Sequence, residues 1–117
     1  MQGDGQVLQA PWWQRARLAD WPSLPDGPGI YCLYEHDADE PVYLGETSDL
    51  RARSATHAAT SWSLRDPWIA VRPLATGTPK YVLHELESDL LGWHFWLTIR
   101  APVFQYRTFR AIGDAAA

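Results

Sequence analysis

The stretch that decides the fold is residues 29–57, which read GIYCLYEHDADEPVYLGETSDLRARSATH. Residues 29–35 alternate strand-forming side chains with a period of two, and residues 41–45 repeat this signal more briefly. Residues 36–41 between them are polar and end in proline, a composition typical of a hairpin connection. The pattern therefore predicts two strands, near 29–35 and 41–45, that pair antiparallel.

The same stretch continues into a predicted helix near residues 48–59. Thr47 or Ser48 can serve as the N-cap, because both side chains carry a hydroxyl that accepts from helical backbone N–H groups. Arg53 and His57 lie four residues apart, so on a helix they are neighbours on one surface. A guanidinium beside an imidazole suits the handling of a phosphate.

Further along the chain, a third strand is predicted near residues 68–74 and a long helix near residues 79–97. Apolar side chains recur there at helical spacing, at Val82, Leu83, Leu86, Leu90, Trp93 and Leu97. Glu87 lies at the border of this apolar stripe and Glu85 lies farther out. We therefore predict an α/β domain with a central three-stranded antiparallel sheet flanked by helices.

The remaining segments are predicted to be peripheral. Residues 1–27 form an N-terminal extension, partly disordered at its start and then rich in tryptophan and proline, with a short helix over Gln14–Ala19. Residues 28–110 form the domain itself. Residues 111–117 form a disordered tail.

Composition limits the class of protein. The chain has 117 residues, 46% of them hydrophobic, which suits one domain with a modest core. No apolar run reaches the roughly twenty residues of a membrane helix, and the N-terminus lacks a signal pattern, so a cytoplasmic protein is expected. Cys32 is the only cysteine and is predicted to be a core thiol.

Charge is unevenly distributed. The net charge is −4, but residues 1–50 carry nine acidic residues against two basic ones, whereas residues 51–117 carry eight basic residues against five acidic ones. The negative net charge speaks against a nucleic-acid partner, since phosphate binding normally shows as a basic surface, but the basic residues beyond position 50 soften this objection. The distribution therefore leaves DNA open as a partner.

Two tripeptides, Gly29-Ile30-Tyr31 and Tyr43-Leu44-Gly45, have eleven residues between them, and Arg53 lies ten residues after Tyr43. In these residues the chain resembles the GIY-YIG nuclease family, whose signature tripeptides lie on adjacent strands before a helix with a functional arginine. The resemblance implies a small GIY-YIG-type domain in which Gly29 and Gly45 are structural motif residues.

The resemblance continues at Glu87, which precedes aliphatic residues as the metal-binding glutamate of the family does. Gln105 follows Pro102 by three residues, where the family has asparagine. Glu85 stays a rival for the metal role, because the gap from Glu87 to Pro102 is longer than in the repair nucleases of the family.

The activity that the resemblance implies is metal-dependent hydrolysis of DNA phosphodiester bonds. Tyr43 or Tyr31 would take a proton from water, and His57 would assist. Arg53 would hold the phosphate, with Arg51 and Gln105 as further nucleic-acid contacts. Glu87 would bind Mg²⁺ or Mn²⁺. A free phenol has a pKa of about 10, so the tyrosine would need Arg53 or the metal to lower it.

A second interpretation is a different class of protein. The same fold could be a catalytically inactive module that binds nucleic acid or a protein partner. The net acidity favours this interpretation, and so does the presence of Gln105 where the family has asparagine. The sequence leaves open the DNA structure recognised, the biological pathway and the oligomeric state, including a homodimer.

Overall fold

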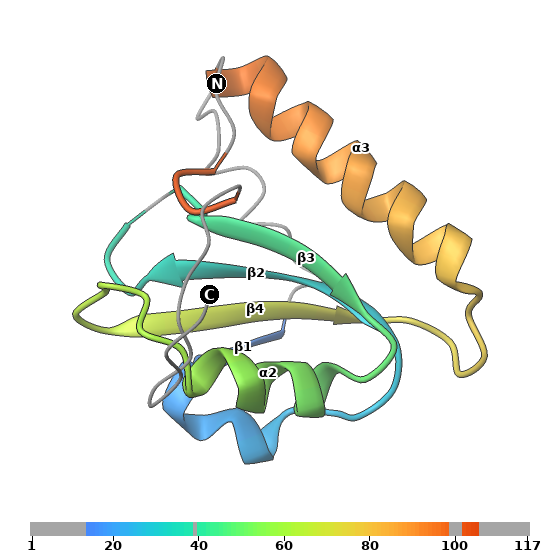
Figure 1. Cartoon of the computed structure of the whole chain (residues 1–117), viewed down its shortest axis with the longest axis horizontal. Coiled ribbons are helices and arrows are strands. Elements are labelled where there is room, and N and C mark those ends of the chain that lie inside the picture. The colour runs from blue at the N-terminus through green and yellow to red at the C-terminus, as the bar shows by residue number, and fades with distance from the viewer. Residues whose placement is uncertain (1–13, 39, 99–101, 106–117) are drawn as a thin grey trace.

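A four-stranded antiparallel sheet forms the centre of the molecule in the computed structural model, which describes residues 14–38, 40–98 and 102–105 (Figure 1). Its strands, in the order β1-β4-β2-β3 across the sheet, are β1 (Gln14–Arg17), β4 (Pro67–Pro73), β2 (Gly29–Glu35) and β3 (Tyr43–Thr47). The helices are the 3-10 helix η1 (Leu18–Ser23), α2 (Leu50–Ala58) and α3 (Lys80–Thr98). The chain is thus a small α/β domain.

The prediction of a three-stranded sheet is wrong, because β1 adds a fourth strand. The short helix predicted over Gln14–Ala19 is wrong for the same reason, since Gln14–Arg17 pair with β4 and only the next six residues are helical. Strand β1 is four residues long, which is too short for its alternation to be distinguished from a helical pattern. Tertiary pairing with β4 decides its conformation.

The predicted strand near 29–35 is confirmed, and so is its antiparallel pairing with the next strand. That next strand is Tyr43–Thr47, two residues later than predicted. It runs past Gly45 because Glu46 and Thr47 still have partners on β2, at Ile30 and Gly29. The third predicted strand, near 68–74, is observed one residue earlier as β4.

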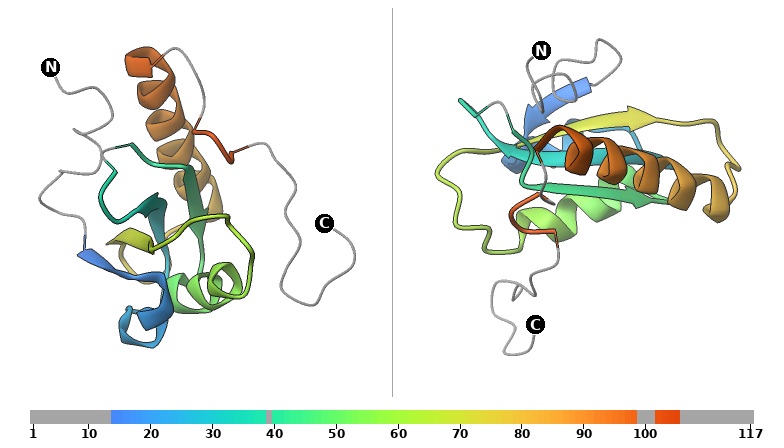
Figure 2. Two further views of the ribbon diagram at one scale, coloured as in Figure 1. Left: turned by 90° about the vertical axis from the view of Figure 1, so that its left-hand side faces the viewer. Right: turned by 90° about the horizontal axis from the view of Figure 1, so that it is seen from above.

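The helices lie on opposite faces of the sheet, which Figure 2 shows in its two views. One face carries Tyr31, Leu33, Ile69 and Val71 and packs on Leu50 of α2 and on Leu18 and Leu24 around η1. The other carries Ile30, Cys32, Leu44 and Ala70 and packs on leucines of α3, which lies mainly over β3 and β2. The domain therefore has a core on each side of the sheet.

Helix α2 begins after an aspartate cap. Asp49 has an extended backbone, and its Oδ1 accepts a hydrogen bond from the Ala52 backbone N–H at 3.2 Å. The prediction of Thr47 or Ser48 as the cap is wrong. Thr47 instead accepts from the Asp49 backbone N–H at 3.0 Å, which fixes the turn between β3 and the helix.

Helix α3 turns a slightly different stripe to the sheet than predicted. Its inward side is formed by Leu83, Leu86, Leu90 and His94. Trp93 was predicted in the stripe but is 46% exposed. His94 is fully buried, because it lies eleven residues, just over three whole turns, after Leu83. The side chain of Leu97 lies outside the described residues.

The outer edge of β3 is covered by residues 102–105. The Phe104 backbone N–H donates to the Val42 carbonyl at 2.8 Å. The side-chain amide of Gln105 pairs with the backbone of Leu44 twice, accepting from its N–H at 2.6 Å and donating to its carbonyl at 2.7 Å. One glutamine side chain thus makes the contacts that a neighbouring strand would make.

Two further predictions concern the ends of the chain and the membrane. Residues 14–27 form β1, η1 and the lead into β2, so this part of the predicted extension belongs to the folded domain. The predicted disorder at the start of the chain and over 111–117 lies outside the described residues. Within the described ranges, no helix combines the length and the apolar character needed to cross a membrane.

Candidate active site

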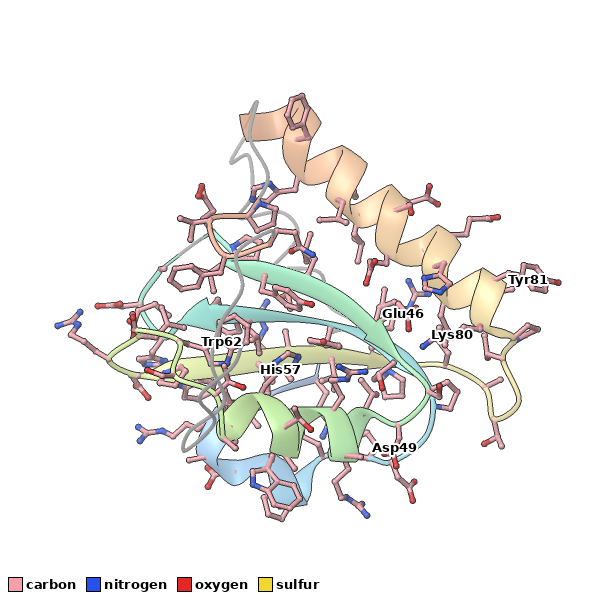
Figure 3. The ribbon with its side chains drawn as sticks, viewed as in Figure 1. Glu46, Asp49, His57, Trp62, Lys80 and Tyr81 are labelled. Atoms are coloured by element: carbon pink, nitrogen blue, oxygen red, sulfur yellow. The ribbon has the colours of Figure 1, made fainter. Side chains whose placement is uncertain are left out.

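Tyr31 of β2, Tyr43 of β3 and His57 of α2 meet in one cluster of rings. The ring centroids of the two tyrosines are 6.2 Å apart, and those of Tyr43 and His57 are 5.5 Å apart. The strand pairing places the tyrosines on the sheet face that α2 covers, and His57 points from the helix toward them (Figure 3). The structure thus brings together three of the predicted site residues.

Gly45 makes room for the Tyr31 ring. It lies directly opposite Tyr31 in the strand pairing, and a Cβ atom at this position would be 2.5 Å from Cζ and Oη of Tyr31. Gly29 is similarly confined, since a Cβ there would be 2.6 Å from the Arg72 carbonyl oxygen and from Leu50 Cδ1. A side chain at either position would therefore collide with neighbouring atoms.

The Tyr31 phenol and the His57 imidazole form a buried hydrogen bond of 2.6 Å between Oη and Nε2. Burial, followed by the charge of Tyr43, raises the pKa of Tyr31 well above 10. Burial and the nearby Arg53 lower the pKa of His57 to about 4. At neutral pH both groups are uncharged, so the hydrogen bond joins a neutral phenol and a neutral imidazole.

Trp62 fixes the position of His57 and was not identified from the sequence. Its indole Nε1–H donates to the His57 carbonyl at 2.9 Å, and its ring centroid lies 5.2 Å from that of His57 and 5.4 Å from that of Tyr43. Figure 3 shows the two labelled side chains close together above α2. Trp62 comes from the irregular segment after α2, so no periodic pattern indicates its role.

Arg53 lies one turn before His57 on α2 and is exposed. It borders an open pocket whose lining residues are Thr47, Ser48, Asp49, Ala52, Arg53 and Thr56. Its positive charge acts on all three rings, since it lowers the pKa of Tyr31, Tyr43 and His57 relative to their values without it. Arg53 thus lines this pocket and also acts electrostatically on the ring cluster.

Two predicted nucleic-acid contacts have other partners in the structure. Arg51 donates from Nε to the Leu24 carbonyl at 2.8 Å, on a different side of α2 from Arg53. Gln105 uses both polar atoms of its amide on Leu44. These bonds give Arg51 and Gln105 roles in holding the fold, and contact with nucleic acid stays a prediction for both.

Glu46, directly after the second tripeptide, is a buried carboxylate that the sequence analysis missed. Its side chain is only 4% exposed and is held by two basic groups of α3. Oε1 is 2.5 Å from Lys80 Nζ, and Oε2 is 2.8 Å from His84 Nδ1 (Figure 3). The signal was present, because the alternation that buries Leu44 also turns Glu46 inward.

Glu87 lies one turn after His84 on α3 and is half-buried. Burial, and then the charge of Glu46, raises the pKa of its carboxyl. The charge of Glu87 in turn raises the pKa of Tyr43 and Tyr31, so it reaches the ring cluster although it comes from the other face of the sheet. Glu85 is exposed. The structure therefore associates Glu87, and not Glu85, with the cluster.

Glu87 is the predicted metal ligand whose charge reaches the ring cluster. Among the described residues, no three histidine, cysteine or acidic side chains come together as a metal-binding group. Lys80 is paired with Glu46. Burial and the charge of Glu46 raise the pKa of Glu87, whereas His84, a hydrogen bond from the Glu46 backbone and Lys80 lower it. A divalent ion here would take oxygen ligands from Glu87, water and a bound phosphate.

Neither a known family model nor a curated protein matches the sequence significantly. The geometry is therefore the basis for assigning a function. It combines two phenols, a neutral imidazole, an exposed guanidinium and a carboxylate at one edge of the sheet. This set can hold a phosphate, transfer a proton and accept a cation.

Proposed function

We propose that the chain is a GIY-YIG-type endonuclease that hydrolyses DNA phosphodiester bonds with Mg²⁺ or Mn²⁺ as cofactor. The observation that carries the proposal is the hydrogen bond between Tyr31 and His57 beside Tyr43, at a place where the charges of Arg53 and Glu87 both act. The order of strands and helices around these residues supports it, because each tripeptide lies on its own strand and Arg53 lies on the next helix.

Tyr43 is the phenol that meets the substrate. It is only half-buried, whereas Tyr31 is 2% exposed and lies behind it. Burial raises the pKa of Tyr43 most, followed by the negative charge of Glu87, while Arg53 opposes both effects. A cation bound at Glu87 would therefore offset the nearby charge that most opposes ionisation of Tyr43.

Hydrolysis then follows from the positions of these groups. Arg53 holds the phosphate and offsets the negative charge that grows on it in the transition state. The Tyr43 phenolate takes a proton from water, the water oxygen bonds to phosphorus, and the bond from phosphorus to the departing sugar oxygen breaks. Tyr31 and His57 act through Tyr43 as positioning residues, since both are buried. The cation at Glu87 would stabilise the departing oxygen.

A second candidate function is a catalytically inactive module that binds nucleic acid or a protein partner. The raised pKa values of Tyr31 and Tyr43 favour it, because both phenols are neutral at pH 7 without further charge nearby. The two functions differ in one measurable respect, which is cleavage in the presence of a divalent ion.

Nicking of supercoiled plasmid by the full chain, with Mg²⁺, Mn²⁺ or a chelator, tests the proposal. We expect nicking with either ion and none with the chelator. Glu87→Gln and Tyr43→Phe should each lower the rate by about a hundredfold or more, on the order of the loss of a transition-state stabiliser. Both variants should fold, since each keeps the shape of the side chain.

The matched control is Glu85→Gln, which removes the same charge two residues away on an exposed side of α3. It should nick at the wild-type rate. A wild type that nicks with neither ion would reject the nuclease and leave the binding module. Loss of nicking in Glu85→Gln but not in Glu87→Gln would show that Glu85, and not Glu87, binds the metal.

A further inference from the structure

A second surface rich in arginine and aromatic side chains lies on the part of the sheet that α3 leaves uncovered. Figure 2, in the view from above, shows α3 running over β2 and β3, with β4 and β1 beyond it. Three arginines, Arg15 and Arg17 of β1 and Arg72 of β4, occur there at positions whose side chains share one face of the sheet. We call this surface the β1–β4 face, and it also includes Tyr34, His36 and Trp68.

The strand pairing determines which side chains this face presents. Arg15 lies opposite Ala70 and Arg17 lies opposite Trp68, so both arginines are on the side of Trp68. Ala70 is small, and Arg15 therefore reaches across it to Tyr34. These positions are on the α3 side of the sheet, away from α2 and the Tyr31–Tyr43–His57 cluster.

Aromatic rings, rather than carboxylates, hold the two guanidinium groups of β1. Arg17 Cζ lies 5.8 Å from the Trp68 ring centroid, and Arg15 Cζ lies 5.9 Å from that of Tyr34. His36 stacks on Trp68 with centroids 4.7 Å apart. In the described part of the chain, no ion pair joins Arg15 or Arg17 to an acidic residue. A ring supports each guanidinium without neutralising it.

The β1–β4 face is strongly basic for a protein of net charge −4. Strands β1 and β4 contain three arginines and no acidic residue. The nearest acidic residue of β2 is Glu35, which is on the opposite face and accepts hydrogen bonds from the backbone N–H groups of Arg65 and Asp66. Exposed arginines two residues apart in a strand are separated by roughly 7 Å, comparable to the spacing of successive phosphates in a nucleic-acid strand.

We propose that the β1–β4 face binds the phosphate backbone of a nucleic-acid strand. Arg15 and Arg17 contact successive phosphates, and the stacked His36 and Trp68 provide a platform for a neighbouring base. The inference extends the proposed function, because it assigns a second contact with the DNA substrate outside the candidate active site. Binding without cleavage measures it separately.

The experiment is binding of a short fluorescein-labelled single-stranded DNA to the full chain, in chelator, from about 50 to about 200 mM salt. Each phosphate contact contributes about 0.7 to the slope of log affinity against log salt for a single strand. We expect Arg15→Gln/Arg17→Gln to reduce the slope by about 1.4 and the affinity on the order of tenfold.

Two variants serve as controls. Arg65→Gln removes the same charge from an exposed arginine outside the face, whose nearest acidic partner is Asp37 at 3.7 Å, and it should leave the slope unchanged. Arg15→Lys/Arg17→Lys keeps both charges and should retain the slope, which separates lost contacts from a damaged fold. Far-ultraviolet circular dichroism verifies that each variant is folded.

Unchanged affinity and slope in the folded Arg15→Gln/Arg17→Gln variant would overturn the proposal. Binding to vesicles of anionic phospholipid through the same arginines, without DNA binding, would assign the face to a lipid surface and overturn it as well. If the double variant loses DNA binding but the wild type never nicks plasmid, the face stands and the nuclease is rejected. If the wild type nicks plasmid and the double variant binds DNA normally, the nuclease stands and the proposal for the β1–β4 face is rejected.

Discussion

His57 is held uncharged by its surroundings, and this couples the stability of the chain to pH. Its pKa is about 4 in the folded state because of burial and Arg53, against 6.5 ordinarily. Between these two values the unfolded chain binds a proton at this histidine and the folded chain does not. The free energy of unfolding therefore falls as pH falls through that window, by up to about 3 kcal/mol from this group.

We expect His57→Gln to remove this dependence. The measurement is the urea midpoint of wild type and variant at several pH values between 4 and 7. The wild type should lose stability more steeply toward acid than the variant. Glu87 acts in the opposite direction, because its raised pKa favours the protonated form in the fold, so the difference between the two chains is the relevant quantity. Parallel curves would contradict the neutral assignment of His57.

At the scale of the elements, pairing of β2 with β3 depends on a glycine opposite a tyrosine. Gly45→Ala places a methyl group 2.5 Å from the Tyr31 ring, and both atoms belong to buried parts of adjacent strands. We expect a loss of about 1–3 kcal/mol in the free energy of unfolding and displacement of Tyr31 from His57. Denaturant unfolding measures the first effect.

The control is Gly92→Ala in α3. Among the described residues, no heavy atom outside the helix's own backbone and the two chain neighbours lies within 4 Å of a Cβ built there. Helical alanine is favoured over glycine by roughly 0.5–1 kcal/mol, so this variant should gain stability. A Gly45→Ala variant as stable as the wild type would contradict this expectation. It would mean that β2 and β3 can move apart to accommodate the methyl group without a loss in the free energy of unfolding.

The elements show what the sequence could and could not predict. Residues 29–35 form a strand as expected, because long runs with a period of two are a local signal. Strand β1 was missed because only its pairing with β4 makes it a strand. In the site, ring positions followed from the tripeptides, but Trp62 and the partners of Glu46 depend on contacts between segments distant in sequence. Contacts of this kind produce no periodic pattern in the sequence, so they could not be predicted from it.

At the scale of the whole molecule, Cys32 reports on unfolding. It lies in the central strand β2, is 0% exposed, and packs with residues of three strands and α3. Burial raises the pKa of its thiol to about 12. Both effects prevent reaction with a thiol reagent until strands and α3 separate.

We therefore expect the rate of thiol modification by a disulfide reagent to follow global unfolding. The rate should be very low in buffer and should rise with urea in proportion to the unfolded population. Since Cys32 is the only cysteine, each chain reacts once. A cysteine introduced at Ser61, which is exposed, should react at once in the folded chain. Rapid modification of Cys32 in native buffer would indicate local opening of β2.

The Gln105 amide on Leu44 has a consequence for how copies of the chain can meet. In most sheets the outermost strand offers its backbone to any extended peptide that approaches, and two molecules can then merge into one continuous sheet. Here Gln105 already occupies the backbone groups of Leu44 in β3, and Phe104 occupies the carbonyl of Val42, the residue before β3. A second molecule would have to displace them first.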